Sequence, residues 1–201
     1  VHNYMPTFEQ KAEALHWFPM FRTWFGLCGL CKLPWNDIVP EDNKDEAEPA
    51  KVSKHIQWYA QYYTAVTGVK ATPDDLITAS EAVYNFQRVF NLKMGYGRRE
   101  HDRIPYRAVG PVTVEEYESR SERYDKQLVE IYKMDINEME TGDKVAAMRR
   151  LREDRYEKLQ DAVYKRRGWT ADGIPTVETV RRLKIDFPEV LEVLNANGVT
   201  S

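Results

Sequence analysis

The sequence predicts an all-α fold, an irregular multi-helix domain with long loops. Apolar residues recur every three or four positions in several segments, which is the spacing of one helix face. These segments begin at residues typical of helix N-termini, and several end at glycines. No segment alternates apolar and polar residues as a half-buried strand does. We therefore expect residues 1–201 to form a single helical domain.

The first two helices are predicted by their ends. Thr7 and Gln10 form a capping-box pattern that opens the first helix. Pro19 lies inside this segment and is expected to kink or interrupt it, because proline lacks an N–H donor. The second helix is expected from about residue 53 to Gly68.

The third helix has the clearest signals. Thr72 is the expected cap and Pro73 takes the first helical position. Its apolar stripe, expected to face the core, consists of Leu76, Ala79, Val83, Phe86 and Phe90.

The second half of the chain predicts further helices. Thr113 and Glu116 form another capping-box pattern. One apolar stripe follows it, consisting of Val114, Tyr117, Tyr124, Leu128 and Ile131. A long charged helix is expected from about Asp143 to Arg167, with both signs of charge on a solvated face. Short helices are expected from Thr176 and from Pro188.

Charge and hydropathy exclude several classes of protein. The net charge of −3 argues against a dedicated nucleic-acid binder. No run of about 18 apolar residues predicts a membrane span, and no secretory signal is recognisable. We expect a cytoplasmic protein, and the initial Val1 suggests an excised segment.

The two cysteines, Cys28 and Cys31, are spaced C-x-x-C beside glycines. This spacing is typical of a redox pair or of part of a metal site, but two buried thiols fit it as well. A cluster held by four thiolates would need cysteines from elsewhere, because this chain has two.

A loop expected from Gly95 to Pro111 places Glu100, His101 and Asp102 in succession between arginines. Such residues are typical of an acid–base site. A surface loop fixed by Arg–carboxylate pairs explains the same composition.

Four segments, in order, resemble the tungsten-containing aldehyde ferredoxin oxidoreductases. They are Gly29–Lys32, Thr72–Asn91, Arg99–Arg107 and Tyr164–Thr176. The resemblance implies the C-terminal part of a tungstopterin/[4Fe–4S] oxidoreductase, which oxidises aldehydes to carboxylic acids and passes electrons to ferredoxin. It implies a tungsten bis-pterin (or its molybdenum equivalent) and a [4Fe–4S] cluster, both needing an N-terminal part. It also implies as partners the N-terminal domains of the same enzyme and a ferredoxin or an iron–sulfur electron-transfer subunit.

The resemblance also assigns residues. Cys31 would be one cluster ligand, with three others supplied by the N-terminal part. Gly29 and Leu30 would lie beside a pterin, and Lys32 completes the cofactor-binding segment. His101 or Glu100 would be the proton donor.

Two departures from the family pattern leave alternatives open. Gly26 and His101 stand where the family has aspartates. The tungsten subunit of an aromatic acyl-CoA reductase, of the benzoyl-CoA type, is therefore the second reading. A third is a non-catalytic helical interaction module with buried cysteines. The charged segment from about Val112 to Arg155 suggests a surface or partner contact particular to a subfamily.

Overall fold

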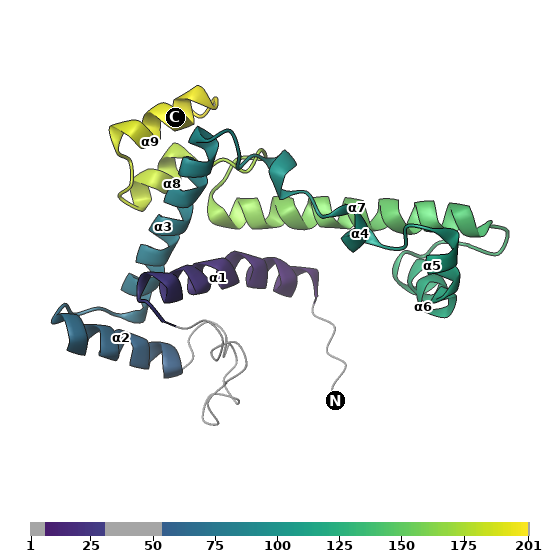
Figure 1. The fold of residues 1–201 in the computed structure, drawn as a ribbon, viewed down its shortest axis with the longest axis horizontal. Helices are drawn as coiled ribbons and strands as arrows, with labels where there is room; N and C mark the ends of the chain where they lie inside the picture. The colour runs from purple at the N-terminus through teal and green to yellow at the C-terminus, as the bar shows by residue number, and fades with distance from the viewer. Residues whose placement is uncertain (1–6, 31–53, 201) are drawn as a thin grey trace. The chain divides into compact units, whose positions relative to one another are not determined.

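A computed structural model describes residues 7–30 and 54–200 (Figure 1). These residues form helices joined by turns and loops, with one isolated bridge between Trp169 and Pro175. The prediction of an all-α fold is confirmed. The α-helices are α1 (Phe8–Leu27), α2 (Lys54–Thr67), α3 (Pro73–Lys93), α4 (Tyr106–Val109), α5 (Val114–Glu118), α6 (Ser121–Lys126), α7 (Thr141–Arg167), α8 (Val177–Arg182) and α9 (Pro188–Ala196). In the described part of the chain, no helix combines the length and the apolar character needed to span a membrane.

The chain divides into two compact units. Unit 1 comprises Val1–Arg99 and Val163–Ser201, and unit 2 comprises Glu100–Ala162. Helix α7 contributes residues to both. That residues 1–201 act as a single helical domain stays a prediction.

Helix α1 runs through Pro19 without a break. The expected capping box between Thr7 and Gln10 is confirmed, but the expected interruption is wrong. Pro19 has no N–H to donate to the carbonyl of Leu15, four residues earlier. That carbonyl accepts a hydrogen bond of 2.9 Å from Nη2 of Arg167 instead. A guanidinium from α7 thus replaces the missing bond, and the helix continues.

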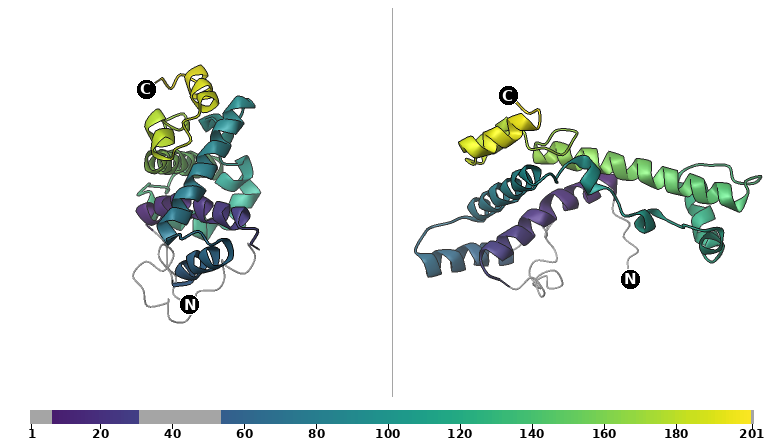
Figure 2. Two further views of the ribbon diagram at one scale, coloured as in Figure 1. Left: turned by 90° about the vertical axis from the view of Figure 1, so that its left-hand side faces the viewer. Right: turned by 45° about the horizontal axis from the view of Figure 1, so that its top comes forward.

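Helix α3 lies at the centre of the packing in unit 1. It contacts α1, α2 and α9, as the views in Figure 2 show. At one end, Leu76 packs in a cluster with Trp24, Phe25 and Ala60 from α1 and α2. At the other end, α3 joins a larger cluster formed with α8 and α9. Its buried members are Val89, Leu92, Ile174, Val177, Val180, Leu183, Ile185, Val190 and Leu194.

The apolar stripe predicted for α3 is only partly correct. Its capping box, Thr72 with Asp75, is confirmed and Leu76 is buried. Phe86 and Phe90, however, are 43% and 55% exposed. The buried face carries polar residues instead, because the loop after α7 binds Asn85 and Arg88 through side-chain hydrogen bonds.

Unit 2 has its own core, made by α5, α6, α7 and a short π-helix η3 (Gln127–Ile131). Tyr117 and Leu128 of the predicted stripe are buried there. The stripe does not lie on one continuous helix, because α5, α6 and η3 are separate elements. Thr113 caps α5 through a 3.2 Å bond from the amide of Glu116, while the Glu116 carboxylate accepts from the amide of Val112.

The charged helix α7 is not simply solvated. Its predicted extent is close to that observed, and Gly168 follows it with φ +67°. Arg149, however, is 9% exposed and donates to the carbonyls of Tyr106, Gly110 and Pro111. Its guanidinium lies 3.8 Å from the centre of the Tyr106 ring. Because loop carbonyls and an aromatic face surround this cation, the prediction of a wholly solvated face is wrong at Arg149.

Candidate functional site

The segment predicted to bind the cofactor begins where α1 ends. The amide of Leu30 donates to the carbonyl of Phe25 at 2.9 Å, and the amide of Gly29 donates to that of Gly26 at 3.3 Å. These two bonds form a Schellman cap, which needs a left-handed residue, and Gly29 has φ +68°. Leu30 is 39% exposed. The cap ends α1 and presents Gly29 and Leu30 at the surface immediately before Cys31. Cys31 and Lys32 lie outside the described residues.

Cys28 is the cysteine that the structure describes. Its side chain is half-buried and packs against the cluster of Trp24 and Phe25. Burial raises the pKa of the Cys28 thiol, so the thiol stays protonated at neutral pH. A protonated thiol is a poor metal ligand and a poor nucleophile. Cys28 therefore has the properties of a packing residue.

The described residues do not form a complete metal site. Within 7–30 and 54–200, no group of three or more His, Cys, Asp or Glu side chains is placed to hold an ion. One buried donor close to the cap is of interest. The indole Nε1 of Trp24, one turn before Cys28, is buried and has no hydrogen-bond partner in the described part.

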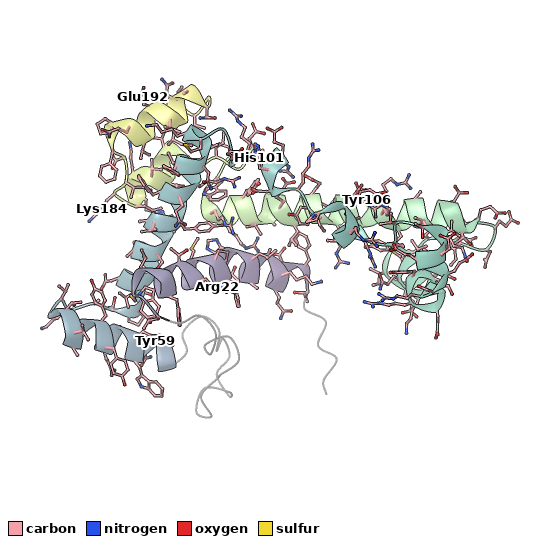
Figure 3. The ribbon with its side chains drawn as sticks, in the orientation of Figure 1. Arg22, Tyr59, His101, Tyr106, Lys184 and Glu192 are labelled. Carbon is pink, nitrogen blue, oxygen red and sulfur yellow. The ribbon has the colours of Figure 1, made fainter. Side chains whose placement is uncertain are left out.

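The second candidate site, Glu100 and His101, lies on a short 3₁₀-helix η2 (Arg99–Asp102). Both side chains are exposed, and Figure 3 labels His101 on this turn. In unit 1, the amide of Arg99 donates to the carbonyl of Asp172 at 2.8 Å. In unit 2, the hydroxyl of Tyr156 donates to the carbonyl of Asp102 at 2.6 Å. Both ends of η2 are thus held through backbone groups, and the Arg99 side chain adds a 3.0 Å hydrogen bond from Nη1 to the carbonyl of Ala171. Arg99 and Asp102 are half-buried, whereas the side chains of Glu100 and His101 are exposed.

The family-like segments Thr72–Asn91 and Tyr164–Thr176 meet in a buried polar cluster around Trp169. We call it the Trp169 cluster, and its members are Tyr84, Asn85, Arg88, Arg167 and Trp169. The indole Nε1 of Trp169 donates to Oδ1 of Asn85 at 2.7 Å. The guanidinium groups of Arg88 and Arg167 lie 4.7 and 4.9 Å from the centre of the Trp169 ring. Tyr84 stacks on Trp169 at 6.0 Å. Aromatic faces and hydrogen bonds therefore stabilise two buried cations.

Two glycines allow the chain to close around this cluster. Gly173 has φ +76°, and its carbonyl accepts from Nε of Arg88 at 2.9 Å. A Cβ at Gly173 would lie 2.5 Å from Nη2 of Arg88, and one at Gly168 would lie 2.2 Å from Oγ1 of Thr179. The same hydroxyl of Thr179 donates to the carbonyl of Gly168 at 2.8 Å. The glycines are needed for backbone conformation and for close approach.

The predicted site residues are divided between the units. Gly29 and Leu30 belong to unit 1, whereas Glu100 and His101 belong to unit 2. Reasoning from the sequence missed Asn85, Arg88 and Arg167 as buried groups. The sequence offered one indication of this. Asn85 and Arg88 are three residues apart, so they share one face of the predicted helix.

Comparisons with known proteins give one result. The family model described as "Aldehyde ferredoxin oxidoreductase, domains 2 & 3" matches residues 1–185. Comparisons with curated proteins and with solved structures found no match.

Proposed function

This chain belongs to the aldehyde ferredoxin oxidoreductase family, and on that premise we propose that it is the helical C-terminal part of a tungstopterin enzyme that oxidises aldehydes to carboxylic acids. The observation that carries the proposal is the family match over residues 1–185, which includes the cap before Cys31. The chain is part of an aldehyde ferredoxin oxidoreductase-like enzyme. The cytoplasm as its compartment and ferredoxin, or an iron–sulfur subunit, as its electron acceptor belong to the proposal.

Cys31 is the proposed ligand that this chain gives to a [4Fe–4S] cluster. The proposal is supported by the Schellman cap at Gly29, which ends α1 and leaves Leu30, the residue before Cys31, 39% exposed. Burial of Cys28 against Trp24 and Phe25 leaves Cys31 as the better candidate of the two thiols. The cluster would supply one-electron transfer when bound. Other cysteines of the enzyme, outside this chain, would provide the remaining ligands.

Gly29, Leu30 and Lys32 are proposed to border the pterin of a tungsten bis-pterin or its molybdenum equivalent. A Cβ at Gly29 would meet no atom of residues 7–30 and 54–200 within 4 Å, which supports close approach of another group. The chemistry of hydride or electron removal would belong to that cofactor, while this segment would supply shape and hydrogen bonds.

His101 is the proposed proton donor, with Glu100 as the second choice. The support is their exposure on a turn that is held through its backbone. An imidazole is suited to proton transfer near neutral pH.

Aromatic acyl-CoA reduction is the second candidate function. It is favoured by Gly26 and His101, which stand where the family pattern has carboxylates. The third reading, a helical interaction module, is less favoured because the family model matches nearly the whole chain.

The test compares the two cysteines in the complete enzyme. We expect Cys31→Ala to remove the electron paramagnetic resonance signal of the cluster and to lower the iron content from about four atoms per molecule. Cys28→Ala is the matched control and should keep both, because its thiol packs in a core. Retention of iron in Cys31→Ala, or its loss in Cys28→Ala alone, would contradict the ligand assignment.

Metal analysis and assays address the rest of the proposal. The purified enzyme should contain tungsten, or molybdenum in its place. Activity with aldehydes and a ferredoxin supports the first candidate, and activity with aromatic acyl-CoA esters supports the second.

A further inference from the structure

Unit 2 contains a pocket of about 340 Å³ that the redox site does not use. It lies between the α4–α5 loop, α5, α6 and α7. Its volume is at the lower end for small-molecule sites. Its wall carries four arginines, Arg107, Arg120, Arg123 and Arg152, and one carboxylate, Glu116. A pocket with this excess of positive charge is suited to an anion.

Arg152 forms a fixed part of the wall. Its Nη1 donates to the carbonyl of Val109 at 3.0 Å, and its Nη2 donates to Oε1 of Gln127 at 2.7 Å. The guanidinium lies 5.5 Å from the centre of the Tyr124 ring. A Cβ at Gly110 would be 3.0 Å from Nη1, so the glycine permits this close packing. The cation is therefore oriented before any ligand arrives.

One of the other arginines is neutralised within the unit. Arg107 forms an ion pair with Glu116. The Glu116 carboxylate also accepts a 2.7 Å hydrogen bond from the amide of Val112. That backbone bond, followed by the charge of Arg107, holds the pKa of Glu116 below its usual value. The pair is charged at neutral pH and leaves three guanidinium groups uncompensated by Glu116.

Arg120 and Arg123 have exposed side chains beside the same pocket. Neither makes an ion pair or a side-chain hydrogen bond with the described residues. Like charges that share a pocket repel one another unless an anion lies between them. Two guanidinium groups with free donors, next to a third that is fixed, match the oxygens of a phosphate group.

We propose that this pocket binds the phosphate or diphosphate group of a small phosphorylated ligand. Arg120 and Arg123 bind its oxygens, and Arg152 forms the rigid back of the site. A phosphate fits better than a lone carboxylate because three positive charges exceed the charge of one carboxylate. A nucleic acid fits less well, because the charge is concentrated in a hollow and the chain as a whole carries −3.

The experiment uses isothermal titration calorimetry on the complete protein with four probes. The probes are orthophosphate, pyrophosphate, ADP and adenosine 3′,5′-bisphosphate. The binding variant is Arg120→Gln with Arg123→Gln. The matched control is Arg150→Gln with Arg155→Gln, which removes the same charge from exposed residues of α7 that do not line the pocket.

We expect pyrophosphate to bind the natural protein, and its Kd to rise at least about tenfold in the binding variant. The control should change the Kd by less than about twofold. The relative affinities of the probes identify the kind of ligand. Tighter binding of adenosine 3′,5′-bisphosphate than of ADP indicates a coenzyme A-like ligand. Equal binding of pyrophosphate and both nucleotides indicates that the phosphates alone are recognised.

Three outcomes would overturn the proposal. They are no binding of any probe at about 10 mM, an equal loss of affinity in the two double variants, and an unchanged Kd for pyrophosphate in the binding variant. The result is independent of the redox proposal, because the Cys31 test reads iron content and this one reads anion affinity.

Discussion

The Trp169 cluster and the turn η2 both lie in segments that resemble one family, but they differ in burial. Trp169 is 7% exposed and is surrounded by Asn85 and two guanidinium groups. Glu100 and His101 on η2 are exposed, and the turn is held by backbone groups of Arg99 and Asp102 together with the Arg99 side chain. The difference indicates that much of the family signature describes a scaffold. The exposed side chains, which a substrate or cofactor could reach, are those of Glu100 and His101 on η2.

The largest loss of stability is expected from Gly168→Ala, which alters the turn beside the Trp169 cluster. A methyl group there would meet Oγ1 of Thr179 at 2.2 Å, and the backbone has φ +67°. We expect a loss of about 3 kcal/mol in the free energy of unfolding, from strain and the clash together. Gly198→Ala is the control, because Gly198 has φ +85° and a Cβ added there would meet no atom of the described residues within 4 Å. It should cost about 1 kcal/mol in urea denaturation, and equal losses would show that packing at Gly168 is unimportant.

A smaller loss is expected from Trp169→Phe. The substitution removes the Nε1 donor and leaves Oδ1 of the fully buried Asn85 without its 2.7 Å hydrogen bond. An unsatisfied buried acceptor costs about 2 kcal/mol. Trp58→Phe, at a residue that is 46% exposed, should change stability by less than about 0.5 kcal/mol. Thermal unfolding of the two variants tests whether the cluster depends on this bond.

The next prediction concerns His16, an imidazole beside the cluster. Burial first, and then the charge of Arg167, lowers the pKa of His16 from its usual 6.5, while Glu13 and Glu81 act in the opposite direction. Its Nδ1 is buried without a hydrogen-bond partner in the described residues.

The sign follows from where the proton binds. Above pH 6.5 His16 is neutral in both states and makes no contribution. Below that pH the unfolded chain binds a proton that the folded chain resists, so stability falls as the solution is acidified. His16→Gln should therefore lose less stability than the natural protein between pH 7 and pH 5 in urea denaturation. Parallel losses in the two proteins would exclude His16 as the cause.

The smallest effect on stability is expected at η2 itself. His101→Ala should change the free energy of unfolding by less than about 0.5 kcal/mol, because the side chain is exposed. Activity of the complete enzyme should nevertheless fall about a hundredfold if His101 transfers a proton. Arg103→Gln, an exposed neighbour, is the control and should keep activity. Full activity in His101→Ala would assign proton transfer to another group, with Glu100→Gln as the next variant to assay.

Much of the fold could be predicted because its signals are local. Thr7 and Thr72 cap helices through residues three positions away, and Gly68 follows the end of α2. The continuation of α1 past Pro19 could not be predicted in the same way. Pro19 removes a bond locally, and the guanidinium that replaces it belongs to Arg167, 152 positions along the chain from the Leu15 carbonyl that it binds.

The candidate site was predictable only in part. The sequence identifies Cys31 and His101 as chemically suitable, and the resemblance assigns them roles. The pocket with Arg120, Arg123 and Arg152 had no such signal, because Arg152 on α7 lies about thirty positions along the chain from the other two. In the sequence, the arginines of α7 indicate only a charged helix face.

By itself, the sequence determined the helical class, the positions of most helices and the membership of a family. These properties depend on interactions between residues a few positions apart, or on motifs that can be recognised from the sequence alone. Tertiary structure alone decided which face of α3 is buried, which arginines bind carbonyls and where positive charge gathers in unit 2. The physical reason is that a guanidinium or an amide satisfies its hydrogen bonds with whatever partner the fold brings near. Spacing along the chain does not specify that partner.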